Sequence, residues 1–161
     1  MKLSAYTEKL LEDIENRINP EAEDDFINQW KTFWNNKSNE IIFTPKRKKI
    51  TAPTLELKNI HINDAIDNLD AMLAMQLEGV SKALGSKNQA LSVRANYGTG
   101  IMTSIFGAEL FKMPREQSTL PTTISVGEDR IREIVSTGLP NIEAGLGKKV
   151  FEFGELCKEV F

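Results

Sequence analysis

Cysteine and histidine are almost absent from this chain of 161 residues, which holds one of each. The single cysteine, Cys157, excludes a disulfide within the chain and a zinc site built from several cysteines. A Ser-His-Asp catalytic triad would have to use the single histidine, His61. No stretch approaches the roughly 20 apolar residues of a membrane-spanning helix, and the first residues lack the apolar core of a secretory signal. We therefore expect a reduced, soluble, cytoplasmic protein.

An excess of positive charge is also missing. The chain has 20 Lys and Arg residues against 23 Asp and Glu residues, which gives a formal net charge of -3 and a pI near 5.3. A nucleic-acid binder needs a basic face that neutralises phosphates, and a helix that lies on a membrane is rich in Lys and Arg. We therefore expect neither nucleic acid nor a membrane among the partners.

Apolar residues recur at helical spacing in two segments near the N-terminus. The first segment covers residues 3–18. Asn19 then fits the N-cap of a second helix, and Pro20 fits its first turn. The second helix carries a broad apolar face: Phe26, Ile27, Trp30, Phe33 and Trp34. Because its polar face is acidic, this apolar face predicts packing on a core or on a subunit rather than on a membrane.

Residues 35–60 hold prolines and polar residues without a period, which predicts an irregular segment. We expect it to separate a helical N-terminal segment, residues 1–58, from residues 59–161, within a single truncated domain. The segment contains a basic run from Lys46 to Lys49. In an acidic chain this run indicates a solvated loop, although a nuclear-localisation or phosphate-binding patch has the same composition.

The clearest helical stripe covers residues 63–84, with Asn63 at the N-cap. Three aspartates share one face of this helix: Asp64, Asp67 and Asp70. Aspartates at that spacing can bind a metal or perform acid–base chemistry, but at a helix N-terminus they also favour the dipole and face water. His61 lies just upstream and fits a capping or surface residue, because the chain has no second histidine to complete a metal site.

The apolar period changes after residue 90. Strand-like alternation covers residues 90–95, and residues 108–113 and 120–126 fit further strands. Helical stretches lie among and after these strands: 101–106, 128–137 and from 140 to the end. Strands separated by helices predict the α/β class, and a closed barrel of eight such units needs about 250 residues. We therefore expect N-terminal helices followed by the first βα units of an incomplete TIM (β/α)8 barrel, the opening portion of a longer protein.

A polar turn follows the first predicted strand and forms the candidate binding site. Arg94 can hold a ligand carboxylate, Asn96 can donate to an oxygen, and Tyr97 can stack on a ring. Gly98 and Gly100 would let a ligand approach the backbone. An ordinary strand-to-helix turn, with Arg94 in a structural ion pair, explains the same residues.

Three stretches resemble the uroporphyrinogen decarboxylase-like family, in a divergent bacterial branch: LSVRANYGTGIMTSIFGAELFKM, NDAIDNLDAMLAMQLEGVSKAL and GLPNIEAGLGKKVFEFGELCKEVF. The resemblance covers residues 60–161 and implies a (β/α)8 barrel preceded by helices. Heme-pathway members of this family decarboxylate uroporphyrinogen without a cofactor, using an Arg-rich turn and an aspartate. This chain has no such turn, and Asn96 stands nearest to the aspartate, which puts that reaction in doubt.

A sister group within the family comprises cobalamin-dependent methyltransferases, which bind zinc through a His-x-Cys pair and a later Cys. Cys157 and His61 do not match this pattern. We therefore expect no metal and no cofactor in this chain, and zinc and a corrinoid only in an intact methyltransferase relative.

The resemblance implies the N-terminal portion of a lyase (a decarboxylase of porphyrin biosynthesis) or of a methyltransferase. Its small-molecule substrate would be a tetrapyrrole or a methyl donor, bound by the candidate turn, with the catalytic residues unassigned. We expect this chain to be inactive alone and to be completed by a missing C-terminal half or by a homodimer. The alternative is a complete non-enzymatic α/β module for binding or self-association.

Overall fold

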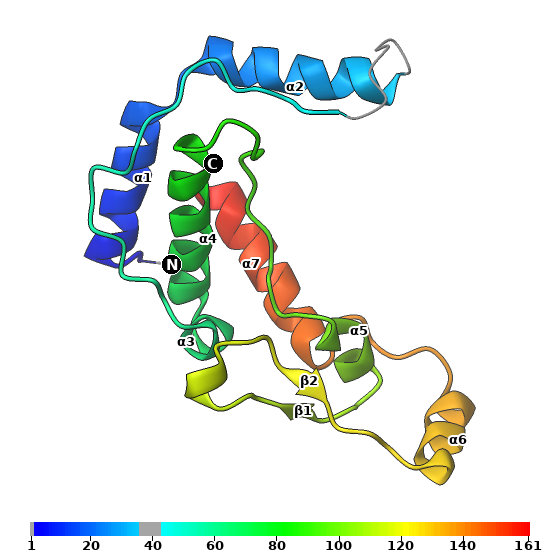
Figure 1. Cartoon of the computed structure of the whole chain (residues 1–161). Helices are drawn as coiled ribbons and strands as arrows, with labels where there is room; N and C mark the ends of the chain where they lie inside the picture. The colour runs from blue at the N-terminus through cyan, green and yellow to red at the C-terminus, as the bar shows by residue number, and fades with distance from the viewer. Residues whose placement is uncertain (1, 36–42) are drawn as a thin grey trace. The chain divides into compact units, whose positions relative to one another are not determined.

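The computed structural model describes residues 2–35 and 43–161. The elements of the described residues are mainly helices (Figure 1). The α-helices are α1 (Ala5–Arg17), α2 (Pro20–Trp34), α3 (Ile62–Asp67), α4 (Leu69–Leu84), α5 (Gly100–Ile105), α6 (Glu128–Thr137) and α7 (Leu146–Val160). The remaining elements are the strands β1 (Leu110–Phe111) and β2 (Thr122–Thr123) and a 3-10 turn, η1 (Arg115–Gln117). No described helix is both long and apolar enough to cross a membrane.

The chain divides into two compact units, which are described separately. The unit that we call the helical unit is drawn from Leu3–Asn59 and Gln76–Val93. The other, which we call the hairpin unit, is drawn from Lys2, Ile60–Met75 and Arg94–Phe161. The boundary between the units falls inside α4, so this helix contributes residues to both of them.

Local capping explains where the first two helices begin. The Ser4 side chain accepts a hydrogen bond from the Thr7 amide at the start of α1. The Asn19 side chain accepts one from the Ala22 amide at 2.9 Å, and Pro20 occupies the first turn of α2. The predicted N-cap and its proline are therefore confirmed. Such caps satisfy backbone donors that have no partner within the helix.

The helical unit has an apolar core, to which α2 contributes part of its apolar face. Its fully buried side chains include Leu10, Phe26, Leu77 and Leu84. The predicted apolar face of α2 divides: Phe26 is buried, whereas Trp34 is 78% exposed. The rings of Trp30 and Phe33 lie 4.7 and 4.5 Å from that of Phe43. Part of this face therefore packs within the unit, as predicted.

The basic run at residues 46–49 is not a uniformly solvated loop. Arg47 is only 3% exposed. Its guanidinium donates to both carboxylate oxygens of Glu23 and to three backbone carbonyls, those of Ala83, Ser86 and Gln89. A buried guanidinium needs such partners, because an unpaired buried charge is costly. Arg47 therefore ties the irregular segment to α2 and to the end of α4.

In the hairpin unit the predicted helix at 63–84 is interrupted. The His61 ring accepts a hydrogen bond from the Asn63 amide at 3.1 Å, so His61 and not Asn63 is the N-cap of α3. Its predicted capping role is confirmed. Asn68 leaves the helical conformation, and its side chain accepts from the Ala71 amide at 3.0 Å. An apolar stripe continues across such a break and does not reveal it.

The predicted incomplete TIM (β/α)8 barrel is wrong. The described residues hold one sheet, in which β1 and β2 pair antiparallel, with Leu110 opposite Thr123. Parallel βα units need a crossover of a dozen or more residues, usually a helix, and the chain between β1 and β2 holds only a short 3-10 turn. Residues 90–95 alternate in exposure as predicted but pair with no strand. Their alternation therefore indicates an extended segment that is not part of a sheet.

Candidate functional site

The predicted binding turn lies in the hairpin unit and leads into α5. Arg94 is exposed and Asn96 is partly exposed, whereas Tyr97 is only 1% exposed. The Tyr97 amide donates to the Ala95 carbonyl at 3.1 Å, which closes a tight turn. The structure therefore leaves Arg94 and Asn96 at the surface and buries the ring that was predicted to stack on a ligand.

Gly98 and Gly100 make room for the hairpin. Gly98 has φ of +79°, and a Cβ added there would lie 3.2 Å from the Cβ of Leu120. A Cβ on Gly100 would lie 2.5 Å from a methyl carbon of Leu110. The contact at Gly98 would be tight, and the contact at Gly100 is closer than two carbon atoms can pack. These contacts give both glycines a packing role, and the predicted ligand contact of the turn stays a prediction.

The burial of Tyr97 has an electrostatic consequence. Desolvation, with the negative charge of Glu152, raises the pKa of Tyr97 to about 12. A phenol with such a pKa stays protonated at neutral pH, so it does not act as a base there.

Two of the three aspartates that share a helix face form ion pairs with another segment of the hairpin unit. Asp64 accepts a pair of hydrogen bonds from the Arg115 guanidinium, both at 2.8 Å, which holds the pKa of Asp64 below its usual range. Asp67 forms an ion pair with Lys112. Both partners belong to the segment that contains β1 and η1. The carboxylates therefore anchor this segment to α3.

His61 and Cys157, the single histidine and the single cysteine, are not arranged as ligands of a zinc ion. One ring nitrogen of His61 caps α3, and the other lies 3.0 Å from the Arg115 carbonyl oxygen. Cys157 is partly buried in α7, and desolvation raises the pKa of its thiol, which disfavours the thiolate that binds metals. Within residues 2–35 and 43–161, no three potential metal ligands lie together.

An apolar surface lies along one side of α6, the side on which the sequence places Ile131, Ile134 and Val135. We call it the α6 surface. It lines a groove of about 520 Å³ and holds no charged residue: Thr103, Phe106, Ala108, Val126, Ile131, Ile134, Val135, Gly138 and Leu139. The exposed fraction is 73% for Val135 and 97% for Leu139. The predicted helix at 128–137 is confirmed, but its apolar side is not covered by the rest of the described unit.

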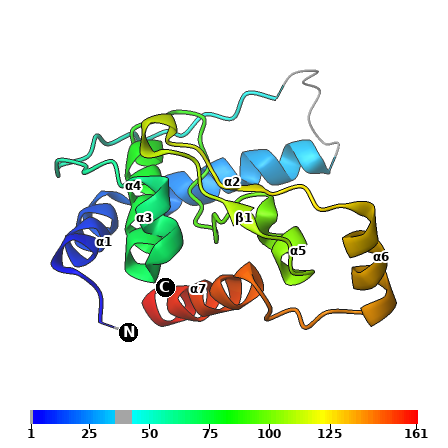
Figure 2. The same cartoon turned by 90° about the horizontal axis from the view of Figure 1, so that it is seen from below.

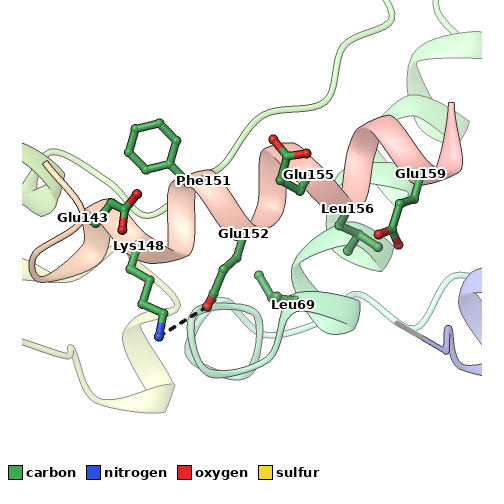
Figure 3. A pocket seen from close by; sticks show the side chains of 8 residues that line it. All are labelled: Leu69, Glu143, Lys148, Phe151, Glu152, Glu155, Leu156 and Glu159. Carbon is green, nitrogen blue, oxygen red and sulfur yellow. Dashed lines mark ion pairs between the residues drawn. The ribbon is translucent and has the colours of Figure 1, made fainter.

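A second groove, of about 470 Å³, runs along α7 (Figure 3). We call it the α7 groove. Leu69, Phe151 and Leu156 supply its apolar side chains. Its charged side chains are four glutamates and one lysine: Glu143, Lys148, Glu152, Glu155 and Glu159. The Lys148 ammonium lies 3.8 Å from a Glu152 oxygen. Because four carboxylates face one ammonium, the groove has an excess of negative charge.

The first residues of α7 are held by α5, which fixes one end of this groove. The Leu146 amide donates to the Ser104 hydroxyl at 2.9 Å. Gly145 has φ of +54° and approaches the Ser104 carbonyl so closely that a Cβ would overlap it. Figure 2 shows α5 beside the start of α7, as Figure 1 does. Farther along α7, the Lys149 ammonium donates to the Ile66 carbonyl of α3 at 2.7 Å.

Comparisons with known proteins find no matching family model, no matching curated protein and no matching solved structure.

Proposed function

We propose that this chain is an association module that forms a homodimer through the α6 surface. The observation that carries this proposal is the exposure of α6: none of its residues is buried, and its apolar side chains line an uncharged groove. A helix gains most of its stability by packing its apolar face. Contiguous apolar surface of this kind marks an association site.

The absence of charge in the groove favours a second copy as the occupant. In a twofold dimer the same patch faces itself, so a charged patch would meet its own charge. On α6 the charges pair within the helix instead: Arg130 lies 2.6 Å from Glu133, and Arg132 lies 2.5 Å from Glu128. Two copies can therefore bring their apolar sides together without a repulsive contact in the groove.

The apolar side chains of the α6 surface are what would stabilise the dimer. Full burial of a side chain such as Val, Leu or Ile contributes about 1.5–3 kcal/mol, and a dimer buries the patch twice. Association itself costs several kcal/mol. A micromolar dimer needs about 8 kcal/mol net, so several of these side chains must be buried on each copy.

The test is sedimentation equilibrium between about 1 and about 100 μM, a range that brackets a micromolar Kd. We expect a dimer for the unmodified chain and a monomer for Val135→Asp and Leu139→Asp. Trp34→Asp is the matched control, because Trp34 is also highly exposed but lies in α2. A monomer at the highest concentration, or equal loss of the dimer in the control, would contradict the proposal.

The resemblance supports a second candidate function. In this candidate the chain binds a tetrapyrrole or a methyl donor, as its resemblance to the uroporphyrinogen decarboxylase-like family implies, and it has no activity alone. What favours it is the exposed Arg94 beside the partly exposed Asn96, on a turn whose backbone the buried Tyr97 holds in place. A guanidinium at the surface can pair with the carboxylates of a tetrapyrrole.

Uroporphyrin, which is fluorescent and carries carboxylates, is the probe for this candidate. We expect it to bind the chain and Arg94→Ala to weaken binding about tenfold, the loss of one charge-assisted contact. Arg132→Ala, which removes an exposed guanidinium from α6, should leave binding unchanged. Absence of binding at about 100 μM, or equal weakening by both variants, would count against this candidate.

A further inference from the structure

The α7 groove combines three apolar side chains with four glutamates and one lysine, and this combination limits what can occupy it. Phe151 is 48% exposed, whereas Leu156 is 4% exposed. The charged side chains labelled in Figure 3 come from α7 and from the residues just before it. The apolar side chains of the groove recruit apolar side chains, and its carboxylates select positively charged neighbours.

Three of the glutamates are spaced along one side of α7. Glu152, Glu155 and Glu159 stand three and four residues apart, so they share a face of the helix. At 1.5 Å per residue they span about 10 Å. Glu155 lies 2.7 Å from Lys158, an exposed contact that exchanges easily with a partner's cation.

A second copy of this chain does not suit the α7 groove, since it would bring the same glutamates against each other. We propose instead that the α7 groove docks a basic amphipathic helix of another protein. Apolar side chains of that helix contact Leu69, Phe151 and Leu156, and its Lys or Arg side chains pair with Glu152, Glu155 and Glu159. A helix with apolar residues at i, i+3, i+4 and i+7 places its basic residues at the matching spacing.

The proposal uses residues that the α6 surface does not contain. The two proposals can therefore fail separately. A chain with Val135→Asp should lose the dimer and still bind the helix. A chain altered in the α7 groove should keep the dimer.

The probe is a fluorescein-labelled peptide of Leu and Lys, with leucines at i, i+3, i+4 and i+7, followed by fluorescence anisotropy. We expect saturable binding that weakens as salt rises. A peptide of the same composition in scrambled order should bind at least about tenfold more weakly, because it cannot present one apolar face. A peptide with Glu in place of Lys should not bind.

Two triple variants separate docking from general attraction between opposite charges. Glu152→Gln with Glu155→Gln and Glu159→Gln should weaken binding at least about tenfold, with a smaller dependence on salt. The control neutralises three exposed glutamates of α1: Glu8→Gln, Glu12→Gln and Glu15→Gln. It removes the same charge and should change binding less than about twofold, since those residues lie outside the groove.

A third variant tests the apolar side chains of the groove. Phe151→Ala should weaken binding about fivefold or more and leave the salt dependence unchanged, because it removes apolar contact only. Circular dichroism and thermal melting establish that each variant is folded. Equal weakening by the two triple variants, or equal binding of the ordered and scrambled peptides, would overturn the proposal.

Discussion

The Arg47 side chain makes five hydrogen bonds that hold the described part of the irregular segment in the helical unit. All three of its nitrogens donate, to Glu23 and to three carbonyls, at distances from 2.6 to 3.1 Å. The guanidinium carbon also lies 4.8 Å from the centre of the Phe26 ring. The planar fork of arginine makes this set of contacts, and a lysine ammonium has too few donors to replace it.

We therefore expect Arg47→Lys to lower the free energy of unfolding by about 3 kcal/mol, the usual cost of breaking a buried ion pair. The matched control is Lys48→Ala, since the Lys48 side chain is 71% exposed and pairs with Asp25 at the surface. That control should cost less than about 1 kcal/mol. Urea unfolding measures both, and similar losses in the two variants would contradict the role of Arg47.

The two tyrosines, Tyr6 and Tyr97, make the stability of the fold depend on pH. Desolvation and a hydrogen bond to Glu78 raise the pKa of Tyr6 to about 12, and desolvation with the Glu152 charge raises that of Tyr97 to about 12. A group whose pKa is raised by folding contributes stability that is full below its unfolded pKa, here about 10. That stability is lost as the pH rises toward 12.

Phenolate absorbance tests this directly. At pH 11 the folded chain should show little phenolate, whereas the chain unfolded in urea should ionise near pH 10. In Tyr6→Phe and Tyr97→Phe, the loss of stability between pH 10 and pH 12 should be smaller than in the unmodified chain. Ionisation of either tyrosine near pH 10 in the folded chain would show that it is not desolvated.

At the scale of elements, glycines of α7 have opposite roles although they share one helix. A Cβ on Gly147 would overlap the backbone carbonyl of Ile142, so the chain before the helix approaches at this point. A Cβ on Gly154 would meet nothing within 4 Å. A glycine inside a helix costs about 0.5–1 kcal/mol relative to alanine when no such contact requires it.

We expect Gly154→Ala to raise the free energy of unfolding by about 0.5–1 kcal/mol, because alanine restricts the unfolded chain. Gly147→Ala should lower it by about 1–3 kcal/mol, the usual cost of overpacking. Thermal and urea unfolding of the two variants provide the comparison. Stabilisation by both substitutions would show that the contact between Gly147 and Ile142 is loose.

Helix positions followed from the sequence better than strand positions did. The predicted helices at 101–106 and 128–137 are confirmed as α5 and α6. The segment at 90–95 alternates but is unpaired, and β1 and β2 are only two residues long each. Helical hydrogen bonds join residues four apart, so helix formation depends on the local sequence. Strand pairing depends on a partner that is distant in the sequence.

At the scale of the whole molecule, self-association should make stability depend on concentration. A dimer that dissociates on unfolding is stabilised by mass action, by about 1.4 kcal/mol for each tenfold rise in concentration. We expect the melting temperature to rise by about 2–4 °C per tenfold increase. Val135→Asp should remove this dependence in differential scanning calorimetry, and a concentration-independent melting temperature of the unmodified chain would contradict the dimer.

The sequence predicted only part of the candidate site. The sequence indicated a turn at Arg94–Gly100, and the positive φ of Gly98 agrees with that expectation. It did not reveal that Tyr97 would be buried or that the glycines would pack against Leu110 and Leu120. Exposure depends on which distant segment covers a residue, and a local pattern does not contain that information.

The sequence by itself determined the cap of α2, the positions of α5 and α6 and the acidic balance of the chain, because these depend on neighbouring residues or on composition. Only the tertiary structure decided that the strands form a hairpin, that Arg47 is buried, and that the apolar side of α6 stays exposed. Each of these depends on which segments far apart in the chain come into contact and which do not. Such contacts depend on how well whole surfaces fit, and the amino-acid pattern of one segment does not specify its partner.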